Sequence, residues 1–249
     1  MPTVPIYPDN GPNHPVSGTI QKPVLVLGAS GEVGQAVVGA LLQAQLAVIA
    51  VAPTREELAS LVRPEGTHAE LIRIPGNAHT ETAGAALANA VRLLRRPPGA
   101  VVAMIGGEFT PGRLLDQPVD RLREKLDQDL FPHLVAARHL VPMLAESDAR
   151  GTYLLIGGPA AESPWAGYGH LSVSSAALRM LALALREETL GGPVRVQQLA
   201  VCAPLCTQAN RENSGPDWPL PEELGRRVVE VLAIAGHEPV LRFDRRRHR

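Results

Sequence analysis

The chain has 249 residues, of which 45% are hydrophobic and 20% charged, a composition typical of a globular protein and unlike that of a disordered one. Its 24 Lys and Arg residues balance 25 Asp and Glu residues, so charge gives no reason to expect a nucleic acid or a membrane surface as partner. Aromatic residues, at 3%, are too few to form a stacking platform for bases or sugars.

The two ends of the chain differ in composition from the rest. Residues 1–21 contain five prolines and lack the basic and apolar regions of a signal peptide, so we expect an extended N-terminal arm. Residues 245–249, RRRHR, form a basic tail whose simplest interpretation is a solvated terminus. Cys202 and Cys206 are the only cysteines and are not at metal spacing with histidines, which favours a reduced, cytoplasmic protein without a metal site. No apolar run is long enough to span a bilayer.

Between these ends, short apolar runs alternate with segments of helical periodicity. The apolar runs predict strands over residues 23–30, 46–52, 69–74, 99–107, 151–158, 194–201 and 239–243. The periodic segments predict helices over residues 32–45, 54–63, 81–96, 119–147, 167–188 and 221–236. Strands separated in this way by helices form a parallel sheet that is covered on both faces. We therefore expect one α/β domain over residues 22–244, a Rossmann-like doubly wound sheet of about seven parallel strands.

The first predicted strand and helix are joined by the sequence GASGEVG, residues 28–34. In such a motif Gly28 makes the tight turn, Gly31 lets the backbone approach a phosphate, and Gly34 lets the helix pack closely on the strand. The N–H groups and the dipole at the start of the helix favour a pyrophosphate. The motif predicts a dinucleotide site, and the alternative is a retained but empty turn. The residues expected to contact the dinucleotide are Gly28, Ser30, Gly31, Glu32, Val33 and Gly34.

The end of the second predicted strand indicates which dinucleotide is bound. NAD-specific proteins of this kind carry an acidic residue there for the ribose diol, whereas this chain has Thr54 and Arg55. A hydroxyl and a guanidinium suit a 2′-phosphate, which favours NADP(H) over NAD(H), although Arg55 at a helix start can also simply face solvent. Asn77 is a candidate for the adenine edge, and Gly106 and Gly107 are expected to pass under the ribose.

Several of these features together resemble one family. The order of the elements, the glycine turn and the sequence HLSVSSAALRMLALALREE, followed by GGPVRVQQLAV, are similar to the short-chain dehydrogenase/reductase family from residue 22 to residue 244. The glycine spacing matches the GxxGxxG form of atypical and extended members, and Glu32 stands where the commoner form has a glycine. The resemblance implies binding of NAD(P)(H), hydride transfer to or from a carbonyl or alcohol, and a homodimer or homotetramer.

The family's catalytic residues do not carry over. Its asparagine, serine, tyrosine and lysine fall on Asp129, Gly158, Leu171 and Ser175. Leu171 cannot transfer a proton, and Ser175 has no charge with which to lower the pKa of a tyrosine. Losing such a relay costs about 10²–10⁴ in rate, so the family's usual mechanism is not expected here.

A rebuilt acid/base set is the alternative. Tyr168 lies about one helical turn before Leu171 and close to His170, while Asp129 and His133 lie one turn apart on the preceding predicted helix. Tyr168 and Asp129 are therefore candidate catalytic residues. Each has a structural interpretation as well: Tyr168 as a residue at a helix start, His133 as a buried structural imidazole, and Asp129 as a solvated or helix-paired carboxylate.

Three functions remain open from the sequence. The first is a dinucleotide-binding protein that has lost the usual catalysis and acts as a sensor, scaffold or partner subunit. The second is an active oxidoreductase, isomerase, dehydratase or cyclase with a rebuilt acid/base set. The third is a structural member with an empty cofactor site. The segment 207–224, where the family has its substrate lid, carries no polar pattern that identifies a small-molecule ligand.

Overall fold

The computed structural model describes residues 22–107, 109–146, 150–234 and 236–244. The predicted Pro-rich arm and the basic tail lie outside the described residues. Within the described part of the chain, no helix is both long enough and apolar enough to cross a membrane.

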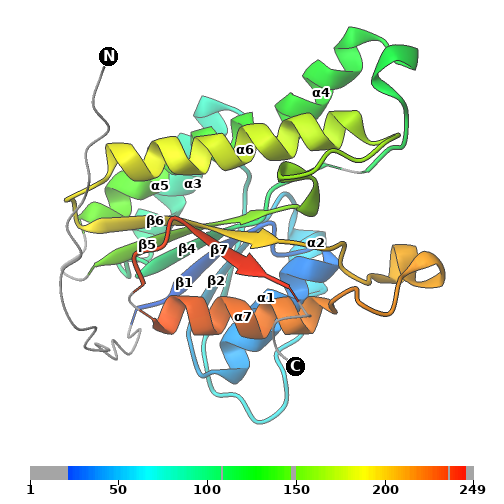
Figure 1. Cartoon of the computed structure of the whole chain (residues 1–249). Helices are drawn as coiled ribbons and strands as arrows, with labels where there is room; N and C mark the ends of the chain where they lie inside the picture. The colour runs from blue at the N-terminus through cyan, green and yellow to red at the C-terminus, as the bar shows by residue number, and fades with distance from the viewer. Residues whose placement is uncertain (1–21, 108, 147–149, 235, 245–249) are drawn as a thin grey trace, which may run out of the picture.

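A seven-stranded sheet forms the centre of the described chain (Figure 1). All neighbouring strands are parallel and their order is 3-2-1-4-5-6-7, with two strands on one side of β1 and four on the other. The strands are β1 (Val24–Leu27), β2 (Val48–Ala52), β3 (Leu71–Pro75), β4 (Ala100–Ala103), β5 (Gly151–Gly157), β6 (Val194–Val201) and β7 (Val240–Phe243). The predicted doubly wound parallel sheet is confirmed.

Helices cover both faces of this sheet (Figure 1). One face carries α1 (Glu32–Gln43), α2 (Arg55–Ala59) and α7 (Pro221–Ala233), and the other carries α3 (Glu81–Leu93), α5 (Phe131–Ala145) and α6 (Gly169–Glu188). Short 3₁₀ turns occur at η1 (Leu114–Asp116), η2 (Pro159–Ala161) and η3 (Gln208–Asn213). The remaining helix, α4 (Val119–Asp129), contacts α5 and α6.

The central strands are buried on both faces, which explains their continuous apolar sequence. In β1, Val24 and Val26 belong to the core under α1 and α7, whereas Leu25 and Leu27 belong to the core under α3 and α5. Successive side chains of a strand point to opposite faces, so a single run of four apolar residues supplies both cores.

Two predicted helices are wrong in their extent. The helix expected over residues 54–63 ends at Ala59. Residues 119–147 were expected to form a single helix, but the structure has α4 and α5, separated at Leu130. Pro132 has no N–H to donate to the carbonyl four residues earlier, so the helical ladder of hydrogen bonds is interrupted there. The chain turns at this point, and α5 begins anew with the N–H groups of His133 and Leu134 donating to the Leu130 carbonyl.

Because all strands are parallel, their carboxyl ends meet at one edge of the sheet. The chain passes from β1 to β2 on one side and later enters β4 on the other side of β1. Ligands of open α/β sheets bind in the crevice outside the strand ends where the connections diverge in this way. A ligand site is therefore expected among the segments that follow β1, β4 and β5.

Candidate functional site

The turn after β1 is shaped by Gly28 and Gly34. Gly28 has φ +76°, a left-handed conformation, and a Cβ there would collide with the carbonyl oxygen of Met104 after β4. A Cβ on Gly34 would collide with the Gly28 carbonyl oxygen and lie 2.8 Å from the Ala29 carbonyl carbon. Both glycines are thus required by the packing of α1 against the strand ends.

Gly31 is different, because the fold does not require it to be a glycine. It lies at the N-cap of α1 with φ −65°, a conformation open to any residue, and a Cβ there would meet no atom within 4 Å. No side chain caps α1 at this end. Gly31 therefore leaves space directly in front of the N–H groups of the helix start, where an anion is favoured.

Two carboxylates border this space. Glu57 of α2 accepts hydrogen bonds from the Ser30 hydroxyl at 2.6 Å and from the Thr54 hydroxyl at 3.3 Å. Glu32, in the first turn of α1, accepts from the backbone N–H of Gln208 at 2.8 Å. The first carboxylate joins the turns after β1 and β2, and the second ties η3 to the start of α1.

The other residues expected to bind the dinucleotide surround the same edge of the sheet. Thr54 caps α2 by accepting from the Glu57 N–H at 3.2 Å, and Arg55 is exposed at the start of that helix. The Asn77 side-chain oxygen accepts from the His79 N–H at 3.0 Å, so its carbonyl stabilises the turn after β3. Gly106 and Gly107 follow β4, with Gly106 exposed.

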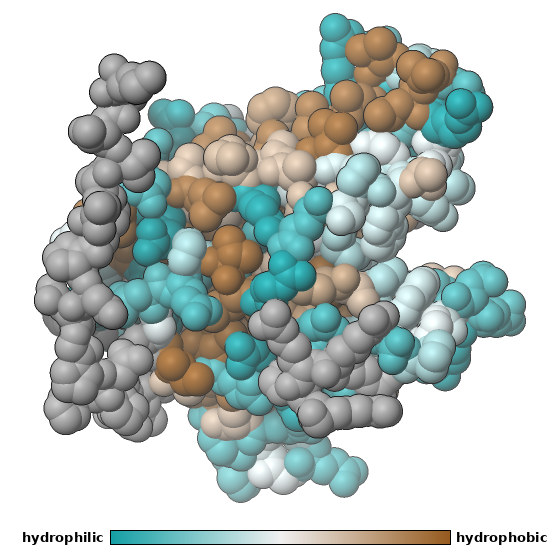
Figure 2. Space-filling model, in the orientation of Figure 1, coloured by the Kyte–Doolittle hydropathy of each residue, from teal (hydrophilic) through white to brown (hydrophobic). Residues whose placement is uncertain are grey.

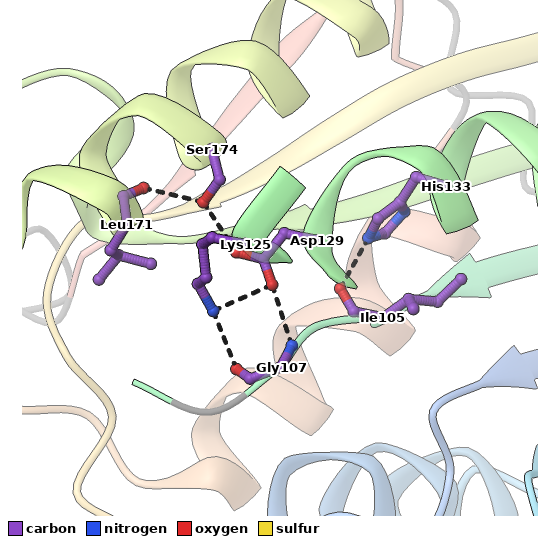
Figure 3. Close-up of polar contacts among 7 residues, drawn as sticks. All are labelled: Ile105, Gly107, Lys125, Asp129, His133, Leu171 and Ser174. Carbon is purple, nitrogen blue, oxygen red and sulfur yellow. Dashed lines mark hydrogen bonds and ion pairs between the residues drawn. The ribbon is translucent and has the colours of Figure 1, made fainter. Parts of the chain in front are cut away.

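Asp129, at the last residue of α4, is the centre of a buried polar cluster (Figure 3). Its Oδ1 accepts from the Gly107 N–H at 2.9 Å and lies 3.1 Å from the Lys125 ammonium, while its Oδ2 accepts from the Ser174 hydroxyl at 2.7 Å. The Lys125 ammonium also donates to the Gly107 carbonyl at 3.2 Å. One carboxylate thus joins the segment after β4, the end of α4 and the start of α6.

A cavity of about 310 Å³ lies beside this cluster. It is bounded by the segment that follows β4, by one side of α4 and by the start of α6. Its lining residues are Gly107, Phe109, Thr110, Arg121, Glu124, Lys125, Gln128, Tyr168, His170 and Leu171. The structure therefore brings Tyr168 and His170 together with Lys125, which the sequence analysis did not single out.

Comparison with known proteins decides the family. A family model described as short chain dehydrogenase matches residues 22–217. The chain belongs to the short-chain dehydrogenase family. Comparison with curated protein sequences finds no match.

Solved short-chain dehydrogenase structures share the fold at low sequence identity. A short chain oxidoreductase from Pseudomonas aeruginosa PAO1 that contains an atypical catalytic center is 18% identical in its apo structure, with a TM-score of 0.79 over 90% of this chain and 96% of that one. Its NADPH-bound structure is 19% identical, with a TM-score of 0.77 over 88% and 94%. A short chain dehydrogenase from Burkholderia cenocepacia J2315 in complex with NADP is 18% identical, with a TM-score of 0.76 over 89% and 87%.

The four positions that the sequence resemblance leads us to align with the family's catalytic residues lie at one end of the sheet. Ser175 faces Gly158, because a Cβ on Gly158 would lie 3.5 Å from the Ser175 Oγ. Leu171 lines the cavity and accepts a hydrogen bond at its backbone carbonyl from Ser174. Asp129 is the only titratable side chain of the four, and both of its oxygens are hydrogen-bonded. Of these four residues, Gly158 and Leu171 have no side-chain group that can donate a proton.

His133 does not form the relay with Asp129 that its spacing suggested. The imidazole is fully buried, and its Nε2 donates to the Ile105 carbonyl at 2.9 Å (Figure 3). Its Nδ1 is buried without a hydrogen-bond partner in the described chain. Burial lowers the pKa of His133 to about 4, against weaker opposing effects of the Ile105 carbonyl and the Asp129 charge. His133 thus holds the segment after β4 as a neutral imidazole.

The sequence analysis did not identify Lys125 or Glu57 as site residues. Of the two, only Lys125 could have been recognised from a local sequence pattern. It precedes Asp129 by four residues, the spacing at which opposite charges pair on a helix. Glu57 carries no such signal, because its contact with Ser30 crosses from α2 to the turn after β1.

Replacing Asp129 with Ala is expected to lower the free energy of unfolding by about 3 kcal/mol, because the buried Lys125 loses its bonded carboxylate. Urea unfolding at neutral pH measures the loss. Ser174→Ala removes a single hydroxyl donor from the same cluster and is expected to cost about 1 kcal/mol. Equal losses in the two variants would contradict the central role of the carboxylate.

The low pKa of His133 predicts a loss of stability in mild acid. The unfolded imidazole titrates near 6.5 and the folded one at about 4, so between these values the unfolded chain binds a proton that the folded chain does not. The contribution is complete above the unfolded pKa and is lost as the pH falls towards the folded one. Between pH 7 and about pH 4.5 the wild type is expected to lose about 2.5 kcal/mol more than His133→Gln in urea unfolding. Parallel pH profiles of the two proteins would contradict this assignment.

Proposed function

We propose that this short-chain dehydrogenase binds NADP(H) at the turn after β1 and lacks the family's usual proton relay, acting as a cofactor-dependent sensor, scaffold or partner subunit. The observation that carries the dinucleotide site is Gly31. The fold accounts for Gly28 and Gly34 by close contacts, but it leaves the space at Gly31 open in front of the helix N-terminus. A pyrophosphate needs that space and those N–H groups.

The residues around the open space fit a dinucleotide. Ser30, Glu32 and Val33 flank the turn, Gly106 and Gly107 form the neighbouring segment after β4, and Asn77 follows β3. These segments lie on both sides of the point where the chain connections diverge, as the two halves of a dinucleotide require. The NADPH-bound structure from Pseudomonas aeruginosa and the NADP complex from Burkholderia cenocepacia support the same ligand class.

The preference for NADP(H) rests on Arg55. Its guanidinium is exposed and makes no hydrogen bond or ion pair with the described residues, so it is available to a 2′-phosphate. The hydroxyl of Thr54 is already bonded to Glu57, which leaves Arg55 as the main candidate for this contact. Glu57 opposes the preference, because its carboxylate adds a negative charge beside Ser30.

The absence of the usual relay is supported by the aligned positions. Leu171 has no proton to give, Ser175 has no charge, and Asp129 is bonded to Gly107, Lys125 and Ser174. A carboxylate with both oxygens bonded inside the protein stabilises the fold, and it is poorly placed to exchange protons with a substrate.

We also propose that the protein is a homodimer or homotetramer in the cytoplasm. Several apolar side chains on η1, α4, α5 and α6 are exposed; they are Leu115, Val119, Phe131, Leu134 and Met180. Figure 2 shows hydrophobic residues at the end of the molecule that carries α4, and others near the centre of the view. A second copy of the chain is the simplest partner for such a surface. The two free cysteines support a reducing compartment.

A second candidate function is an active enzyme with a rebuilt acid/base set. The cavity favours it, because Tyr168, His170 and Lys125 line one space next to Leu171. Asp129 is less suited to catalysis than its sequence position suggested.

Gly31→Asp is expected to weaken NADPH binding at least about tenfold, because the carboxylate fills the phosphate space and repels the pyrophosphate. Aspartate is a favourable N-cap residue, so the thermal unfolding midpoint is expected to stay within a few degrees of the wild type. Fluorescence titration with NADPH, and in parallel with NADH, measures the affinities. The matched control is Gly39→Asp, which adds the same charge to open space on the same helix. Wild-type protein that binds neither dinucleotide would favour a structural member with an empty site.

Arg55→Gln is expected to weaken NADPH binding about tenfold and to leave NADH binding unchanged, because only NADPH carries the 2′-phosphate. The same titrations on Arg63→Gln, an exposed arginine beyond α2, control for the general loss of positive charge. Equal losses of NADPH affinity in Arg55→Gln and Arg63→Gln would contradict the preference for NADP(H). A loss of NADH affinity in Arg55→Gln as large as its loss of NADPH affinity would contradict it as well.

A further inference from the structure

Glu32 joins the turn after β1 to a segment far along the chain. It is the first residue of α1, directly after Gly31, and its two carboxylate oxygens accept from the backbone N–H of Gln208 at 3.1 and 2.8 Å. Gln208 is the first residue of η3 and lies 176 residues later in the chain. The first N–H groups of a helix have no acceptor within that helix. Here a carboxylate from another element supplies the acceptor.

The segment that contains η3 is a closed loop over residues 206–219. Its two ends meet, because the Cys206 N–H donates to the Pro219 carbonyl at 2.8 Å. Inside the loop, the Cys206 thiol donates to the Ser214 hydroxyl at 3.3 Å, and that hydroxyl donates to the Arg211 carbonyl at 2.8 Å. A loop with joined ends and internal hydrogen bonds keeps its shape by its own contacts.

The 206–219 loop is not anchored by core packing. All its residues are described, and none contributes a side chain to either hydrophobic core. Figure 1 shows the loop, in orange, projecting from the body of the molecule, and Figure 2 shows a hollow between this projection and the end that carries α4. Segments with few buried apolar contacts open at a low cost in free energy. The hydrogen bonds from Gln208 to Glu32 therefore matter for the position of the loop.

The Glu32 carboxylate also belongs to the helix turn at which the dinucleotide site is proposed. The first N–H groups of α1 attract negative charge, and Glu32 already supplies one such charge directly after Gly31. A pyrophosphate in front of the same N–H groups repels this carboxylate. Because Glu32 is exposed, its side chain can turn towards solvent, but it then gives up both hydrogen bonds from Gln208. A bound pyrophosphate and the Glu32–Gln208 contact thus oppose each other.

We propose that the Glu32–Gln208 contact is autoinhibitory: it holds the 206–219 loop against the turn after β1 in the free protein, and a bound dinucleotide releases the loop. The inference rests on the dinucleotide site proposed at Gly31. It deepens that proposal, because a cofactor-dependent sensor needs a part of its surface that changes with occupancy. Coupling between two sites is reciprocal, so a contact that the dinucleotide weakens must itself weaken dinucleotide binding by the same factor.

The first test is a fluorescence titration of the full-length protein with NADPH. Glu32→Ala removes the charge and both acceptor oxygens, and it is expected to raise the NADPH affinity at least about fivefold, roughly the effect of one lost hydrogen bond. Glu32→Gln removes the charge but keeps one acceptor oxygen, so its affinity is expected to lie between those of the wild type and Glu32→Ala. The matched control is Glu65→Gln, an exposed carboxylate ahead of β3, which is expected to bind as the wild type does.

The second test is hydrogen exchange, measured by mass spectrometry on peptides from the 206–219 loop. Saturating NADPH is expected to speed this exchange in the wild type about threefold or more, because release of Gln208 leaves its N–H open to solvent. Glu32→Ala is expected to exchange at the faster rate without NADPH and to change little when NADPH is added. Glu65→Gln is expected to follow the wild type in both states.

The outcomes separate this inference from the dinucleotide site on which it rests. Binding of NADPH by the wild type with unchanged or slower exchange in the loop overturns the autoinhibitory contact and leaves the dinucleotide site standing. An unchanged NADPH affinity in Glu32→Ala overturns the contact in the same way. Failure of both the wild type and Glu32→Ala to bind NADPH overturns the two proposals together. Binding by Glu32→Ala alone supports both.

Discussion

The hydrogen-bonded carboxylate of Asp129 is the interaction on which the site end of the molecule depends. It is almost fully buried, and it gathers a backbone N–H from the segment after β4, an ammonium from α4 and a hydroxyl from α6. Three elements that are distant in sequence thus share one acceptor. A buried charge of this kind destabilises the fold unless all its hydrogen bonds and its ion pair are made. The three elements are therefore expected to keep their positions together. The position of Gly107 and the shape of the neighbouring cavity both follow from it.

The three glycines after β1 differ in what the fold requires of them. Gly28 and Gly34 are explained by contacts inside the protein, whereas no contact within 4 Å requires a glycine at position 31. A short-chain dehydrogenase that had kept this turn only for packing would need just two of the three. Near the same end of the sheet, the side chains of Ser174 and Ser175 are both buried.

Much of the fold could be predicted from the sequence, because burial on both faces of a parallel sheet leaves a clear pattern. The runs VLVL of β1 and VIAVA of β2 are apolar throughout, and each is followed by a helix that begins within a few residues. The contacts of the candidate site could not be predicted from the sequence in the same way. The pairing of Ser30 with Glu57 and of Ser174 with Asp129 joins residues 27 and 45 positions apart, and no local periodicity reports such contacts. The place of His170 in the cavity wall beside Asp129 is likewise visible only in the three-dimensional arrangement.

The interruption between α4 and α5 has a wider consequence. A continuous helix over residues 119–145 would have run along the direction of α5, against the sheet. Instead, the missing N–H of Pro132 lets α4 leave the sheet and reach α6, so that its charged side chains border the cavity. The cavity is thus built on an element that contributes no hydrophobic side chain to either of the two cores. Its lining can change from one relative to another while the packing of the sheet stays as it is.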